Sequence, residues 1–259
     1  MVVTLARAFF DESKEGKRWL CVSGYIFEAE KFLVLDSGWK DMLGNLPYFR
    51  MSECNAAQGV FKGMTDPECD IKARRAIQLI KQNMSDGIAV SIDMRFADLI
   101  PKLGAYKSAY TFACWQCLMG VRTWIQRTKY QGDMAYFFEA GEDSEGEADE
   151  IMKGIFRNAE LRRAYRYIDH SFADKEKMRG LQCGDLLAWQ WLRHVQRMEQ
   201  GKPDRGDFNA LMEREHHFQH YDEKQIRWLK NGVAVQEWKR KNLSILRLGE
   251  PSEWLNRAK

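Results

Sequence analysis

Short segments rich in β-branched and aromatic residues alternate along this chain with longer segments whose apolar residues recur at helical spacing. The sequence predicts strands at residues 2–10, 19–27, 49–52, 87–93, 134–138 and 165–172. It predicts helices at 28–43, 66–84, 107–127, 142–163 and 180–198. Strands that alternate with helices in this way are typical of the α/β class.

The chain becomes more polar after Gly-Lys-Pro at residues 201–203. Beyond this point the sequence predicts only a few weaker helical stretches. With 259 residues, 45% of them hydrophobic, the chain can bury one large core. We therefore expect one domain at residues 1–200, with a helical C-terminal extension at 201–259 packed against it as a peripheral appendage.

Charge and cysteine content limit the classes of function. Forty Lys and Arg oppose 37 Asp and Glu, a net charge of +3, so any nucleic-acid surface must be local. The sequence shows no signal-peptide pattern and no apolar run near the ~20 residues of a spanning helix, which predicts a cytoplasmic protein without a membrane partner. The six cysteines lack a regular spacing, and we expect free thiols, including Cys114 and Cys117.

Three acids occur where solvation alone would not place them. In an extended segment Asp11 shares a face with Phe9, and Glu139 shares one with Phe137. Asp185 lies on the apolar stripe of its predicted helix, where a carboxylate needs a partner. If the three converge, a divalent cation would relieve their repulsion, and carboxylate oxygens suit Mg²⁺ or Mn²⁺. Two such ions can activate water for phosphodiester cleavage.

Other roles remain open for each acid. Asp11 and Glu139 could be ordinary turn residues after strands. Asp185 could cap its helix or pair with a nearby Arg. Asp93 also ends a predicted strand and is a reserve candidate for the site, although Arg95 could simply pair with it.

Two further clusters are weaker candidates. His216 and His220 are four residues apart and would share a helical face, yet no Cys or acid completes a zinc site, and we interpret them as surface residues. The basic run at 157–166, interleaved with Tyr165 and Tyr167, could follow a phosphate backbone and stack bases, or could be a solvated helix face.

Three motifs together resemble a known family. They are Phe-Asp-Glu-Ser at 10–13, Phe-Glu-Ala-Gly at 138–141 and Gly-Leu-Gln-Cys-Gly-Asp-Leu-Leu-Ala at 180–188. They resemble the family of domain of unknown function 3800, uncharacterised bacterial and phage proteins similar in expected fold to RNase H and retroviral integrases. The resemblance covers roughly residues 1–195, and its last motif is the most specific. At position 14 this chain has Lys where the family usually has Gly.

The resemblance implies an RNase H-like mixed sheet flanked by helices. It marks Asp11, Glu139 and Asp185 as an acidic metal site with Mg or Mn, and Glu53 as a possible fourth ligand. Spacing alone gives no argument for Glu53. The family has no settled substrate, and fold does not imply function.

Two functions follow as hypotheses. One is a metal-dependent nuclease or related phosphoryl-transfer enzyme, with Asp11, Glu139 and Asp185 as catalytic metal ligands and nucleic acid as the substrate. The other is a non-catalytic RNase H-like module that binds nucleic acid or protein in a defence or mobile-element system. The sequence leaves open whether the partner is DNA or RNA, and it leaves the oligomeric state unknown.

Overall fold

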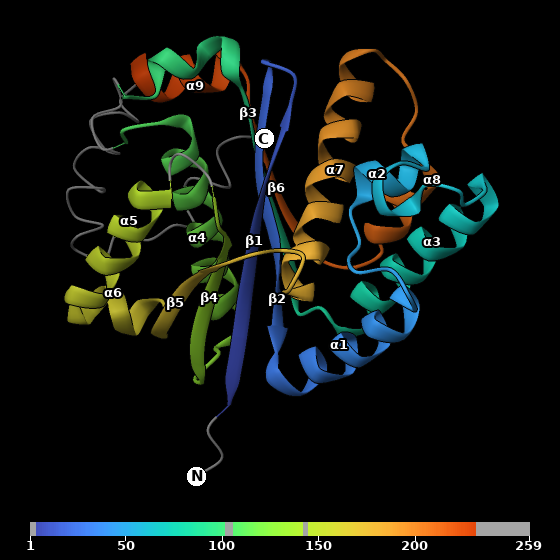
Figure 1. Cartoon of the computed structure of the whole chain (residues 1–259). Coiled ribbons are helices and arrows are strands. Elements are labelled where there is room, and N and C mark those ends of the chain that lie inside the picture. The colour runs from blue at the N-terminus through green and yellow to red at the C-terminus, as the bar shows by residue number, and fades with distance from the viewer. Residues whose placement is uncertain (1–3, 102–105, 142–144, 232–259) are drawn as a thin grey trace.

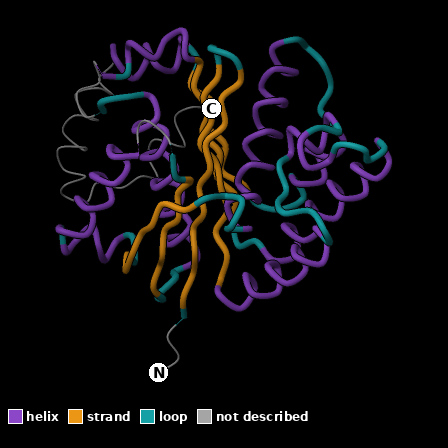
Figure 2. The backbone as a smooth tube through the Cα atoms, viewed as in Figure 1, coloured by secondary structure: helices purple, strands orange, loops and turns teal. Residues whose placement is uncertain are grey.

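A six-stranded mixed sheet runs through the computed structural model, which describes residues 4–101, 106–141 and 145–231 (Figure 1). The strand order is β5-β4-β1-β2-β3-β6. The strands are β1 (Leu5–Glu15), β2 (Trp19–Glu28), β3 (Asp86–Asp93), β4 (Asp133–Glu139), β5 (Tyr167–Ala173) and β6 (His216–Tyr221). Helices cover both faces of the sheet (Figure 2). The α/β class with a mixed sheet flanked by helices is therefore confirmed.

Two helical layers enclose two hydrophobic cores. One face carries α4 (Ala109–Thr128), α5 (Glu145–Arg157), α6 (Ala159–Ala164) and α9 (Glu223–Asn231). The other carries α1 (Ala29–Leu43), α2 (Met51–Ala56), α3 (Asp66–Asn83), α7 (Arg179–Glu199) and α8 (Gly206–Leu211). Strand alternation divides the side chains, so that Phe10 joins the α4 core and Phe9 the α7 core. Asp11 therefore points toward α7.

The central strand β1 is longer than its apolar run. We expected it to end at residue 10, but its ladder with β2 continues to Glu15 and turns at Gly16, whose φ is +58°. Asp11 thus lies in the middle of a strand, opposite Ser23. On its other side β1 runs parallel to β4, with Phe10 opposite Phe138, which brings Glu139 beside Asp11.

Glycine occupies two positions where α7 contacts the central strands of the sheet. A Cβ at Gly180 would stand 2.5 Å from ring atoms of Phe9. One at Gly184 would stand 3.1 Å from Asp11 Cβ and from Ser23 O. The Ser23 hydroxyl also donates to the Gly184 carbonyl at 3.0 Å. The absence of these side chains lets Asp185, the next residue, approach the sheet.

Three segments differ from the sequence prediction. Residues 49–52 form no strand; the segment leads into α2. The expected helix at 142–163 falls partly outside the described residues, and the rest is broken at Asn158, whose side chain caps α6. Residues 216–221 form an edge strand parallel to β3 instead of a helix. Phe218 of this strand stacks on Trp191 of α7 with ring centroids 4.3 Å apart.

The C-terminal extension, as far as it is described, is therefore part of the sheet as well as helical, because β6 lies beside β3. Residues 232–259 lie outside the described part, and the domain boundary at residue 200 stays a prediction.

All six cysteines are free and buried, Cys114 and Cys117 among them. No helix within the described ranges has the length and apolar character needed to cross a bilayer.

Candidate functional site

The structure brings together three acids that are far apart in the sequence. Asp11 lies in the middle of β1, Glu139 is the last residue of β4, and Asp185 lies in the N-terminal half of α7. Each faces the same side of the sheet, because Asp11 and Glu139 follow the strand alternation and α7 packs there. Their roles as metal ligands or catalytic groups stay predictions.

The three carboxylates meet at the ammonium of Lys175. Its Nζ lies 2.9 Å from Glu139 Oε1, 3.0 Å from Asp11 Oδ2 and 3.4 Å from Asp185 Oδ1. Lys175 is itself buried, with 8% of its side chain exposed. The partner that Asp185 requires is thus a lysine shared with two other acids, and not the nearby Arg or the helix cap considered above.

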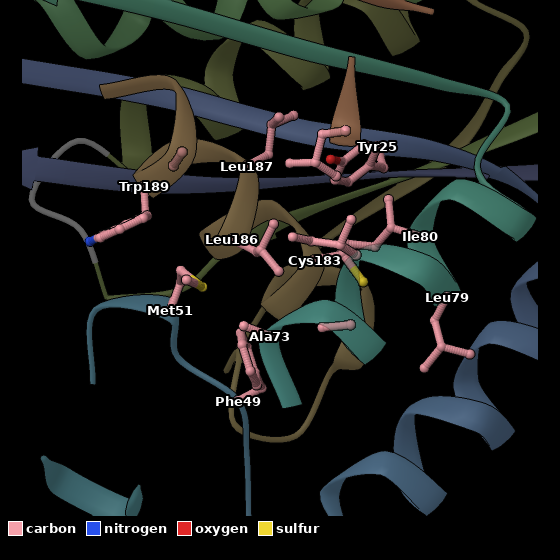
Figure 3. Close-up of a cluster of buried hydrophobic side chains, with 14 of the residues drawn as sticks. Tyr25, Phe49, Met51, Ala73, Leu79, Ile80, Cys183, Leu186, Leu187 and Trp189 are labelled. Carbon is pink, nitrogen blue, oxygen red and sulfur yellow. The ribbon is translucent and has the colours of Figure 1, made fainter. Parts of the chain in front are cut away.

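Backbone donors fix the other carboxylate oxygens. The amide of Glu12 donates to Asp11 Oδ1 at 2.9 Å, and the amide of Met51 donates to Asp185 Oδ2 at 2.8 Å. Figure 3 shows the segment carrying Phe49 and Met51 beside Cys183 and Leu186 of α7. The amides of Phe49 and Met51 are thus hydrogen-bonded to side chains of α7, Gln182 and Asp185, and not to a neighbouring strand.

Gln182, one turn before Asp185, is hydrogen-bonded to the chain segments around Lys175. Its side-chain oxygen accepts hydrogen bonds from Trp39 Nε1 at 2.8 Å and from the Phe49 amide at 3.0 Å. Its side-chain nitrogen donates to the carbonyl oxygen of Lys175 at 2.9 Å. Gln182 thereby joins α1, the segment before α2 and the β5–α7 connection, which Figure 1 shows passing across to the α7 side of the sheet. The backbone of Lys175 is thus fixed independently of its side chain.

The charges in this cluster do not balance, because one lysine faces three acids. Burial raises the pKa of Asp11 well above its ordinary value. The hydrogen bond with Glu139 and the charges of Asp185 and Glu139 raise it further, while the charge of Lys175 lowers it. Burial lowers the pKa of Lys175, but the three carboxylates more than offset this and raise it. We infer that Lys175 stays charged.

The donor set suits a hard divalent cation in its chemistry, since three largely buried carboxylates already surround a positive charge. Their spacing is that of an ammonium ion pair, 2.9–3.4 Å from Nζ, whereas carboxylate oxygens lie about 2.0–2.1 Å from Mg²⁺. In the part of the chain that is described, no set of three or more His, Cys, Asp or Glu side chains is already spaced to hold a metal ion. A metal at this site would therefore have to replace Lys175.

The structure places Glu53 and Asp93 elsewhere. Glu53 lies on α2, where it accepts a hydrogen bond from the Val60 amide at 3.1 Å and contacts Tyr48 and Arg50. No hydrogen bond or ion pair seen among the described residues joins it to Asp11, Glu139 or Asp185. Asp93 pairs with Arg95, the alternative considered from the sequence.

The structure also places the two weaker clusters of candidate residues. Tyr165 and Tyr167 are buried, so they are not available to stack bases beside the basic run. His216 and His220 belong to a strand, where the ring of His220 accepts or donates a hydrogen bond with Ser91 at 2.9 Å.

Sequence reasoning missed Lys175 as a member of the site. It lies in Asp-Lys-Glu-Lys at 174–177, which has the composition of a solvated turn and carries no periodic signal. Gln182 was quoted within a motif but given no role. The motif was therefore the signal for Gln182, whereas Lys175 is recognised only in three dimensions, where its ammonium reaches Asp11.

No family model matches the sequence, and no curated protein matches it. The resemblance to the domain of unknown function 3800 family therefore depends on the three motifs alone.

Proposed function

We propose that this chain is a divalent-metal-dependent nuclease, or a related phosphoryl-transfer enzyme, in which Asp11, Glu139 and Asp185 hold Mg²⁺ or Mn²⁺. One observation carries the proposal: three acids from β1, β4 and α7 surround a single cation in a buried site that keeps an excess of negative charge. A buried carboxylate whose pKa is strongly raised beside other acids, as for Asp11, is a feature typical of functional sites.

A bound divalent ion supplies an activated water and neutralises charge on the leaving oxygen of a phosphodiester. The protein's own groups orient the ligands. The Glu12 amide fixes one oxygen of Asp11 and the Met51 amide fixes one oxygen of Asp185, so the remaining oxygens face the common centre. Gly180 and Gly184 set the distance between the helix and the strand that carry these acids.

The substrate class that we propose is DNA or RNA, by analogy with the RNase H-like fold that the resemblance implies. With a net charge of +3, the chain as a whole lacks the strongly basic character of many nucleic-acid-binding proteins, so contact with the substrate must be local. Free cysteines support a location in the cytoplasm.

The test is cleavage of labelled single- and double-stranded DNA and RNA of one sequence by the full chain, with Mn²⁺, with Mg²⁺ and with EDTA. Asp11→Asn, Glu139→Gln and Asp185→Asn should each lower the rate by about 100-fold or more, since even partners of metal ligands contribute 10–100-fold. Asp169→Asn, an exposed acid on β5, is the control and should cleave at the wild-type rate. Glu53→Gln decides whether Glu53 belongs to the site. Absence of metal-dependent cleavage of all four substrates would contradict the proposal.

A second candidate is the non-catalytic module, and one observation favours it: Lys175 already pairs with all three acids, as in a structural ion-pair network. In that case the wild-type chain would show no Mn²⁺ binding and no cleavage. It would still retain a nucleic acid or protein partner, and this partner would also be retained by Asp11→Asn.

A further inference from the structure

We propose that Lys175 is the resident counter-ion of the metal-free site, and that its ammonium and a divalent ion occupy the space between Asp11, Glu139 and Asp185 alternately. This inference rests on the proposed function, because it concerns how the same site takes up its metal. It assigns a counter-ion role to Lys175, a residue that lies outside the three motifs.

Position is the first reason. Lys175 Nζ lies within 3.4 Å of an oxygen of each acid, so a cation bound by all three carboxylates would need the volume that the ammonium now fills. Two cations this close in a buried site would repel each other strongly. Binding of one therefore requires that the other leave.

The second reason is that the backbone of Lys175 and its ammonium are held by different groups. Its carbonyl oxygen is bound by the buried side chain of Gln182, while its ammonium, among the residues that the structure describes, pairs only with the three carboxylates. The ammonium sits on a flexible four-carbon stem and is strongly hydrated once exposed. The side chain can thus leave the site while the backbone of the β5–α7 connection stays in place.

Charge balance is the third reason. Without a cation, three carboxylates would face one another in a buried site and destabilise the metal-free fold. Lys175 removes much of that repulsion, and in doing so it competes with the metal. The same side chain should therefore stabilise the metal-free protein and weaken metal binding.

The experiment compares Mn²⁺ binding to the wild-type chain, Lys175→Met and Lys177→Met, measured as loss of the free-ion signal in electron paramagnetic resonance. Methionine keeps most of the length of lysine and removes its charge. Lys177 is the matched control, because it lies two residues away in the same turn with 85% of its side chain exposed. We expect Lys175→Met to bind Mn²⁺ at least tenfold more tightly than wild type, and Lys177→Met to bind as wild type does.

A second measurement on the wild-type chain covers the case in which Lys175→Met does not fold. Amine acetylation followed by peptide mass spectrometry reports how exposed each lysine is. Lys175 should react slowly in EDTA and at least tenfold faster in saturating Mg²⁺, while the rate at Lys177 stays constant.

The outcomes separate this inference from the proposed function. If wild type binds Mn²⁺ and folded Lys175→Met binds it no more tightly, or if Mg²⁺ leaves the acetylation of Lys175 unchanged, the exchange is overturned and the metal-dependent function survives. If wild type and Lys175→Met both fail to bind Mn²⁺, the proposed function falls and the exchange falls with it.

Discussion

Two aspartates of the sheet, Asp11 on β1 and Asp93 at the end of β3, are equally buried and have opposite electrostatic surroundings. Asp93 is one acid between two arginines: Arg95 Nε lies 2.9 Å from its Oδ1 and Arg18 Nη2 lies 3.5 Å from its Oδ2. Asp11 is one of three acids around a single lysine. The sequence gives both the same description, an acid that follows an apolar strand segment.

The pKa values of the two residues follow this difference. Burial raises the pKa of Asp93, but hydrogen bonds and charge from Arg95 and the charge of Arg18 more than compensate, so its pKa is lowered overall. The pKa of Asp11 is raised by burial and by its acidic neighbours. The comparison teaches that two carboxylates with equally little exposed surface can differ in pKa direction, and that the ratio of acids to bases around them helps to separate a candidate site from a structural ion pair.

The largest expected effect on stability is that of Lys175→Met. It leaves three buried carboxylates without a cation, and we expect a loss of about 3–5 kcal/mol in the free energy of unfolding at neutral pH without metal. Urea unfolding in EDTA measures it. Lys177→Met should change stability by less than about 0.5 kcal/mol. A loss below about 1 kcal/mol for Lys175→Met would show that the acids do not depend on the lysine.

Asp93→Asn should have a smaller effect. It removes charge-assisted hydrogen bonds, but the two arginines are partly exposed and water can replace the carboxylate, so we expect a loss of about 1–2 kcal/mol at neutral pH. The thermal unfolding midpoint should fall accordingly. A more stable Asp93→Asn protein would place Asp93 in the same electrostatic class as Asp11 and break the comparison.

The two aspartates should also respond oppositely to pH. Because the folded-state pKa of Asp11 is raised, its contribution to stability is complete below the ordinary carboxyl value of 3.8 and is lost as pH rises through the folded-state pKa. Asp93 has a lowered pKa, so its contribution is present above 3.8 and is lost as pH falls through the folded-state pKa.

Urea unfolding of Asp11→Asn and Asp93→Asn in EDTA, at a series of pH values from acidic to neutral, separates these contributions. Relative to wild type, Asp11→Asn should gain stability as pH rises above about 4, whereas the deficit of Asp93→Asn should shrink as pH falls below about 4. If the stability differences of the two variants from wild type changed with pH in the same direction, Asp11 and Asp93 would not have opposite electrostatic surroundings.

The smallest effect without metal is expected for Asp185→Asn. Lys175 keeps two carboxylate partners, and the asparagine oxygen can still accept from the Met51 amide, so stability in EDTA should stay within about 1 kcal/mol of wild type or rise. The rise in melting temperature that excess Mn²⁺ gives wild type should be reduced in this variant. A large loss in EDTA, with no Mn²⁺ effect on wild type, would identify a purely structural ion-pair network.

How far the sequence predicts the structure depends on whether the determining contacts are local. Strand alternation around Phe9 and Phe137, and the apolar stripe around Asp185, pointed to the three acids that the structure brings together, and the three motifs set them apart from Asp93. Strand β6 was missed because its pairing with β3 is a long-range contact. Helix α2 was missed because the backbone donors before and at its start bind side chains of α7. Lys175 was missed because nothing in a charged turn distinguishes the lysine that folds inward from Lys177, which does not.

The contacts that form the site join residues far apart in the sequence, so the site can form only late in synthesis. The contact between Asp11 and Lys175 spans 164 positions, and the one between Met51 and Asp185 spans 134. A ribosome therefore releases β1, with its acid, long before the lysine and the helix that complete the site exist. Because contacts between such distant segments form slowly, a nascent or truncated chain that ends before α7 exposes a strand carrying Asp11 without its counter-charge. The acidic centre is thus a late product of folding, and it forms only after the chain has been synthesised through α7 and this helix has docked on the sheet.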